Sequence, residues 1–121
     1  DAPETTGVFD AKTCVLCSAD CFGALMEKPS DSAAEIAPSH LKKGLETWAT
    51  IDAPWLHAVN PRTFASSLET IRKLDPAVIL SSHLPPAAGM NETLLRHLLS
   101  AQSAPPFSGP DQSALEQAPR R

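Results

Sequence analysis

The residues best suited to chemistry lie in two short stretches of the sequence. The first, CVLCSADCFG at residues 14–23, holds all three cysteines of the chain together with Asp20. The second, SSHLPP at residues 81–86, places His83 directly after an apolar run. A carboxylate oxygen and an imidazole nitrogen are ligands that zinc and iron both accept in proteins. The two stretches therefore predict a metal site, provided that the fold brings them together.

The three cysteines are a competing set of ligands. Chelating Cys-x2-Cys pairs normally sit on a turn that directs both sulfurs toward one point. Here Val15 and Leu16 separate Cys14 from Cys17 and favour a strand, in which positions i and i+3 point to opposite faces. Cys21 lies beyond the expected strand end, and the sequence has no second cysteine pair. We predict that the cysteines are small buried hydrophobic residues and not metal ligands.

Asp20 and His83 each also have a purely structural interpretation. An aspartate after a strand can cap a helix start, and a single histidine is often part of a hydrogen-bonded structure. Their shared placement favours chemistry, because each follows an apolar strand and α/β proteins build their sites at the carboxyl ends of strands.

The strands that must position these residues are short. Residues 6–9 and 13–17 are β-branched and apolar runs on either side of residues 10–12, which predicts a hairpin. Residues 77–80, AVIL, form a continuous apolar run that is typical of a strand covered on both faces. Residues 83–86, HLPP, are expected to turn away from the end of that strand.

Helices are predicted between and after these strands. Residues 27–39 are expected to form a loop, and Leu41, Leu45 and Trp48 have the spacing of a helix over residues 41–50. Trp48 and Trp55 are interpreted as packing residues, with a wall of the substrate site as the alternative. His40 is placed at a helix start, whereas His57 and His97 are expected on the surface.

Two further helices have clearer start signals. Asn60 and Pro61 predict a helix with an apolar stripe of Phe64, Leu68, Ile71 and Leu74, and Asn91 is expected to cap the last strong helix. The segment from residue 102 onward is rich in proline and serine, with one short helix expected around residues 111–117. A hairpin followed by helix, strand and helix predicts a mixed α/β fold.

Composition excludes several classes of protein. The chain of 121 residues is 42% hydrophobic, which is enough for a buried core. Its formal net charge of -4 and its lack of a long basic run argue against a nucleic-acid surface. No apolar run approaches the roughly 20 residues of a membrane span. Three cysteines that cannot all pair favour a reducing, cytoplasmic location.

The two stretches resemble motifs of the metallo-β-lactamase-fold superfamily, in particular its flavodiiron-like branch. Residues 15–23 resemble the strand that ends in an aspartate followed by a small residue, Phe and Gly, and residues 79–83 resemble the strand that ends in Ser-His. The resemblance implies that Asp20 bridges two metal ions and that His83 binds the second one. The branch's His-x-Pro-Asp motif falls on residues 1–4, where Asp1 replaces the histidine and becomes a third candidate ligand.

This resemblance covers only the second half of the family's domain. It implies that residues 1–101 are the C-terminal half of a metallo-β-lactamase-like αββα sandwich and that residues 102–121 are a C-terminal tail. The His-rich loop of the family's first half has no counterpart in this sequence, and the chain opens without an initiator methionine. We therefore expect a piece of a longer protein, whose bare sheet is covered by the missing N-terminal half or by a homo-oligomer partner.

The resemblance also implies the chemistry. The intact domain is expected to hold two divalent metal ions, zinc or iron, and to act on a small-molecule substrate. The leading hypothesis is a binuclear metal-dependent hydrolase. The alternative is a flavodiiron-like di-iron oxidoreductase or an oxygen-binding sensor module. The replacement of the family's histidine by Asp1 favours the sensor module. Three ligands are too few for two ions, so the chain alone is expected to bind metal weakly and to be inactive.

Overall fold

Four short strands form one sheet in the computed structural model of the chain, which describes residue 2 and residues 4–118. β1 (Val8–Asp10) and β2 (Val15–Cys17) pair antiparallel, which confirms the predicted hairpin. β2 pairs parallel with β3 (Val78–Ser81), and β3 pairs antiparallel with β4 (Leu84–Ala88). The strand order is therefore β1-β2-β3-β4.

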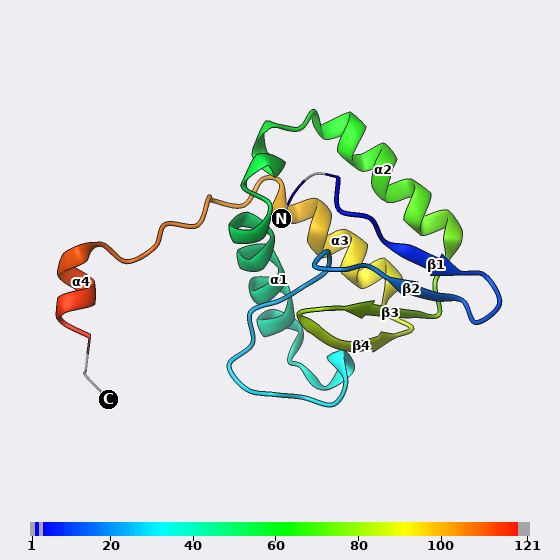
Figure 1. Cartoon of the computed structure of the whole chain (residues 1–121), viewed down its shortest axis with the longest axis horizontal. Coiled ribbons are helices and arrows are strands. Elements are labelled where there is room, and N and C mark those ends of the chain that lie inside the picture. The colour runs from blue at the N-terminus through cyan, green and yellow to red at the C-terminus, as the bar shows by residue number, and fades with distance from the viewer. Residues whose placement is uncertain (1, 3, 119–121) are drawn as a thin grey trace.

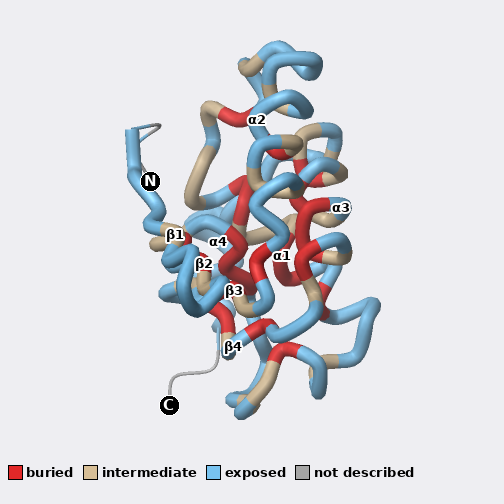
Figure 2. Tube along the Cα trace, turned by 90° about the vertical axis from the view of Figure 1, so that its right-hand side faces the viewer, coloured by how far each residue is buried: buried red, intermediate tan, exposed pale blue. Residues whose placement is uncertain are grey.

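Three longer helices accompany this sheet. They are α1 (Pro38–Asp52), α2 (Pro61–Leu74) and α3 (Asn91–Ala101). Two 3-10 turns, η1 (Ala33–Glu35) and η2 (Pro54–Ala58), flank α1. Figures 1 and 2 place α1 and α3 together on one side of the sheet, with α2 packed against α3. The predicted mixed α/β class is confirmed, and α1, α2 and α3 lie on a single side of the sheet.

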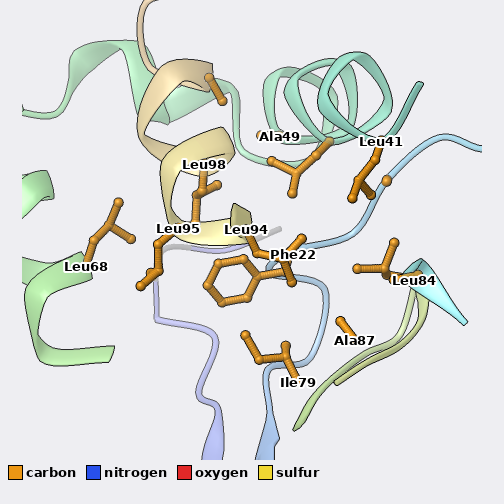
Figure 3. Close-up of a cluster of buried hydrophobic side chains, with 14 of the residues drawn as sticks. Phe22, Leu41, Ala49, Leu68, Ile79, Leu84, Ala87, Leu94, Leu95 and Leu98 are labelled. Atoms are coloured by element: carbon orange, nitrogen blue, oxygen red, sulfur yellow. The ribbon is translucent and has the colours of Figure 1, made fainter. Parts of the chain in front are cut away.

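The core lies between this sheet face and the helices. Phe9, Leu16 and Ile79 are paired across β1, β2 and β3 and face the helices. Phe22 lies in the middle of the cluster, with Ile79 on the sheet side and Leu94 of α3 on the other (Figure 3). Burying side chains of this size stabilises the fold by about 1.5–3 kcal/mol each. The loop that carries Asp20 is therefore anchored in the core by one of its own side chains.

Helix α2 starts as its sequence predicts. The Asn60 side chain accepts hydrogen bonds from the backbone N–H groups of Arg62 and Thr63, and Pro61 occupies the first helical position. The helix ends at Asp75, whose φ of 45° is left-handed. Of its apolar stripe, only Leu68 is fully buried.

Three predicted boundaries differ from the structure, and each difference involves a proline or an asparagine. Pro38 begins α1 instead of ending the loop before it, because a proline suits the first helical position. Pro85 and Pro86 lie within β4 instead of turning the chain away, since a strand at the edge of the sheet tolerates missing N–H donors. Asn91 is the first residue of α3 and not its cap, which is Met90.

The predicted burial of β3 on both faces is wrong. Ile79 is fully buried under the helices, but the neighbouring Leu80 is 39% exposed on the opposite face. Val8 in β1, on the same opposite face, is 65% exposed. Within residues 4–118, the helices pack against one face of the sheet only, so the second face meets solvent (Figure 2).

The first residues of the C-terminal segment, 102–104, contact the rest of the fold through hydrogen bonds. The Gln102 side chain donates a hydrogen bond of 2.8 Å to the carbonyl of Val59, and a ring nitrogen of His57 lies 2.8 Å from the carbonyl of Ala104. The chain then leaves the body and forms α4 (Gln112–Glu116), the expected short helix (Figure 1). A domain boundary between residues 101 and 102 stays a prediction.

In the described part of the chain, no helix has both the length and the apolar character that crossing a lipid bilayer requires.

Candidate metal centre

Asp20 and His83 lie close together because β2 and β3 run parallel. Cys17 at the end of β2 is paired with Leu80 near the end of β3, so both strands deliver the following residues to the same edge of the sheet. The Oδ1 atom of Asp20 lies 3.4 Å from the Nε2 atom of His83. Both side chains remain partly exposed, at 33% and 45%, so a ligand from solvent can reach them.

The loop that carries Asp20 is tightly held. Ala19 and Phe22 have positive φ angles of 50° and 65°, a conformation that costs side chains other than glycine energy and persists where surrounding contacts enforce it. Those contacts come from the end of β3. The carbonyl of Ala19 accepts hydrogen bonds from the Ser82 N–H at 2.8 Å and from the Ser81 hydroxyl at 3.2 Å. The two strand ends are thereby tied into one unit.

His83 is fixed in the turn between β3 and β4. Its carbonyl accepts a hydrogen bond of 3.0 Å from the N–H of Ala24, just after the Asp20 loop. Its ring lies against the indole of Trp48, with ring centroids 4.2 Å apart and planes tilted by 38°. The indole N–H of Trp48 donates a hydrogen bond of 3.1 Å to the carbonyl of Asp20. A residue of α1 thus contacts both candidate ligands.

The two donor atoms fit the coordination shell of a single metal ion. Metal–nitrogen and metal–oxygen distances of about 2.0–2.2 Å place neighbouring donors of a tetrahedral site about 3.3–3.6 Å apart. The observed 3.4 Å between Asp20 and His83 is close to that edge. The described residues contain no group of three or more His, Cys, Asp or Glu side chains that could hold an ion, and the third predicted ligand, Asp1, lies outside the described residues. Metal binding by this pair stays a prediction.

The prediction that the cysteines are buried is wrong for Cys14 and Cys17, whereas at Cys21 the thiol itself is buried. Cys14, Cys17 and Cys21 are free and exposed. Cys14 lies in the turn between β1 and β2, and Cys17 points to the bare face of the sheet, opposite the buried Leu16. At Cys21 part of the residue is exposed, while burial of its thiol raises the pKa to about 11. The local sequence predicted a hairpin turn, but it did not show that the turn includes Cys14 or that Cys17 lies on the bare face.

The remaining histidines lie away from the Asp20–His83 pair. His40 is exposed near the start of α1, and His57 contacts the carbonyl of Ala104. His97 was expected on the surface, but it is half-buried in α3, and burial is the main cause that lowers its pKa. His83 is therefore the imidazole that the fold places beside Asp20.

Two hollows meet at Trp48. A cavity of about 390 Å³ lies on the core side and reaches Asp20, and side chains of Phe9, Phe64 and Ile71 form part of its apolar wall. A more open groove of about 560 Å³ contains His83. Trp48 lines both, which favours the alternative interpretation of this tryptophan as a wall of the site over that of a packing residue. No local signal marks it, because 28 residues separate it from Asp20.

Comparison with known proteins gives a similarity in fold. No protein-family model and no curated protein sequence matches the chain. Among solved structures, the rubredoxin:oxygen oxidoreductase of the anaerobe Desulfovibrio gigas is similar, with a TM-score of 0.65 and 17% sequence identity. The similarity covers 85% of this chain and 26% of that chain, so this chain spans about a quarter of its length. The chain is thus a mixed α/β protein whose fold is similar to part of a metallo-β-lactamase-like flavodiiron protein.

Proposed function

We propose that this chain contributes Asp20 and His83 to the metal centre of a larger metal-dependent oxidoreductase of the flavodiiron-like type. The observation that carries the proposal is the 3.4 Å approach of their donor atoms at the ends of two parallel strands. The similarity in fold to an oxygen oxidoreductase supports the oxidoreductase class over the hydrolase predicted first from the sequence.

Asp20 and His83 have distinct tasks in this proposal. The carboxylate of Asp20 has two oxygens and can bridge two ions, whereas the Nε2 atom of His83 offers one lone pair to one ion. Two ions bound there would supply Lewis acidity and, if they are iron, electrons for the reduction of a small oxidised molecule. Because the loop and the turn are held by hydrogen bonds from Ser81 and Ser82, the two ligands keep their separation before any ion binds.

The ligand set is completed from elsewhere. Two donors leave an ion well short of four to six ligands, so we propose that Asp1 and side chains of an N-terminal half-domain supply the rest. The chain alone should therefore bind metal weakly and lack activity. The open groove beside His83 is the proposed entrance for a small-molecule substrate.

The bare face of the sheet is the proposed contact surface for that half-domain. Register pairs Val8 with Cys17 and Cys17 with Leu80, which gives one row of exposed side chains across three strands. An apolar row of this kind on a sheet is unfavourable in water and is typical of a surface that another element covers. We propose the N-terminal half-domain as the occupant, because the similar oxidoreductase is about four times as long as the matched segment.

Metal analysis of the longer protein that contains this chain tests the proposal. The wild type should contain iron and show a visible spectrum that changes with oxygen. Asp20→Asn and His83→Ala should each lose most of the bound metal, while His57→Ala is a matched control because His57 lies on η2 and contacts Ala104. Colourless protein with bound zinc would instead favour the hydrolase. Full metal content in both Asp20→Asn and His83→Ala would contradict the proposed site.

A further inference from the structure

We propose that Trp48 is a positioning residue that holds Asp20 and His83 at the separation that a shared metal ion needs. This inference rests on the proposed function. Trp48 is not itself a metal ligand, because its indole N–H donates hydrogen bonds and offers no free lone pair to an ion. Its effect must therefore act through the two residues that it contacts.

The two contacts of Trp48 are of different kinds. The indole N–H donates its hydrogen bond to the backbone carbonyl of Asp20, 3.1 Å away. The indole ring lies against the ring of His83 at 4.2 Å, within the range of favourable aromatic contacts. One side chain on α1 therefore restrains the peptide of one candidate ligand and the ring plane of the other.

The carbonyl of Asp20 is a second point at which the loop is held, next to the Ala19 carbonyl that Ser81 and Ser82 bind. It accepts hydrogen bonds from the Trp48 indole and from the N–H of Gly23, both at 3.1 Å. On either side of it, Ala19 and Phe22 have positive φ angles. A backbone in this conformation relaxes when its restraints are removed. Loss of the indole N–H should therefore shift the direction in which the Asp20 side chain leaves the loop.

Gly23 gives an independent way to disturb the same contact. A Cβ atom at Gly23 would lie 2.5 Å from the Trp48 Nε1 atom and 3.0 Å from the His83 Cβ atom. Both distances are shorter than ordinary van der Waals contact, and an indole ring moves only as a rigid unit. The substitution Gly23→Ala should therefore displace the Trp48 ring the most and crowd His83 less, while leaving Asp20, Trp48 and His83 chemically intact.

The experiment uses the 121-residue chain and Co²⁺ as the probe, with binding followed through the paramagnetic broadening of the backbone amide signals of residues 19–24, which every variant retains. Trp48→Phe keeps an aromatic ring but removes the N–H, and we expect about threefold to tenfold weaker Co²⁺ binding, as for the loss of one hydrogen bond. Trp48→Leu removes both contacts and should weaken binding further. Trp55→Phe is the matched control, because Trp55 is half-buried and lines the same apolar cavity.

A second measurement needs no metal. The Cε1–H signal of His83 should carry a ring-current shift in the wild type and in Trp48→Phe, and should lose it in Trp48→Leu. Urea unfolding of each variant separates these effects from a general loss of stability. If Trp48→Leu does not fold, Trp48→Phe and Gly23→Ala decide the question.

The outcomes distinguish this inference from the proposed function. If Asp20→Asn and His83→Ala lose Co²⁺ binding while Trp48→Phe, Trp48→Leu and Gly23→Ala bind as the wild type does, the role of Trp48 is overturned and the site stands. If Asp20→Asn and His83→Ala bind Co²⁺ like the wild type, the proposed site falls and the positioning role falls with it.

Discussion

The two faces of the sheet differ sharply although the same strands form both. On one face, Leu16 and Ile79 are buried beneath α1 and α3. On the other, Val8 and Leu80 are exposed apolar side chains, and Cys17 lies between them. Side chains along a strand alternate between faces, so each strand contributes to both surfaces at once. The exposed apolar side chains of the bare face are the basis on which we propose that another element covers it.

This difference explains why one sequence prediction failed. The continuous apolar run of residues 77–80 predicts a strand covered on both faces, and only one face is covered within the described residues. An apolar run of this kind suits a strand with apolar contacts on both faces. In the described residues, the helices supply those contacts on one face only. The exposed face of β3 is therefore the surface at which we propose that the N-terminal half-domain binds.

The largest expected effect is a difference in the free energy of unfolding when one leucine on each face of the sheet is replaced by alanine. Leu16→Ala removes a buried side chain and should lower the free energy of unfolding of this chain by about 2–4 kcal/mol. Leu80→Ala removes a partly exposed one and should cost less than about 1 kcal/mol. Urea unfolding measures both. Equal losses would show that the bare face is already covered, for example by a second copy of the chain.

An effect of intermediate size is expected on the rate at which the cysteines are labelled, which should depend on whether the proposed half-domain covers the bare face. In the chain alone, a maleimide should label both Cys17 and Cys14 readily, because both are exposed. Cys21 should react more slowly, since a pKa of about 11 leaves little thiolate at pH 8. In the proposed longer protein, contact with the N-terminal half-domain should protect Cys17, whereas Cys14, which lies in the turn between β1 and β2, should stay reactive. Protection of Cys17 in the isolated chain, together with a dimeric mass, would contradict the proposed occupant and favour self-association.

The smallest expected effect is on the pH dependence of stability, and it comes from His97 in α3. Burial is the main cause that lowers the pKa of this imidazole in the folded chain below its ordinary value of 6.5. The unfolded chain therefore binds the proton more readily, and stability should fall as the pH drops below about 6.5. His97→Gln should reduce this fall by a fraction of a kcal/mol, measured by thermal unfolding at pH 7.5 and 5.5. An unchanged pH dependence in His97→Gln would show that other groups cause it.

The sequence predicted correctly those elements that are determined by residues close together in the chain. Asn60 and Pro61 begin α2, and the hairpin of β1 and β2 forms where β-branched runs flank a short polar segment. The arrangement of Asp20 and His83 required more than local signals. It followed from the expectation that two apolar strands lie side by side with their ends at the same edge.

The features that were missed depend on contacts between distant parts of the chain. The place of Trp48 beside His83 is set by the packing of α1, which no short motif encodes. The strand β4 was missed because two prolines argue against a strand unless it lies at an edge, and edge position is a property of the whole sheet. The exposure of Cys17 likewise depends on which face the helices cover.

The most direct test of the central claim uses paramagnetic Co²⁺ added to the isotope-labelled chain. Paramagnetic broadening falls steeply with distance, so even weak binding identifies the residues nearest to the ion. Our account predicts that the signals of Asp20 and His83 broaden first and together, while those of His40 and His57 remain sharp. Broadening centred on His40 or His57, or on His83 without Asp20, would contradict it.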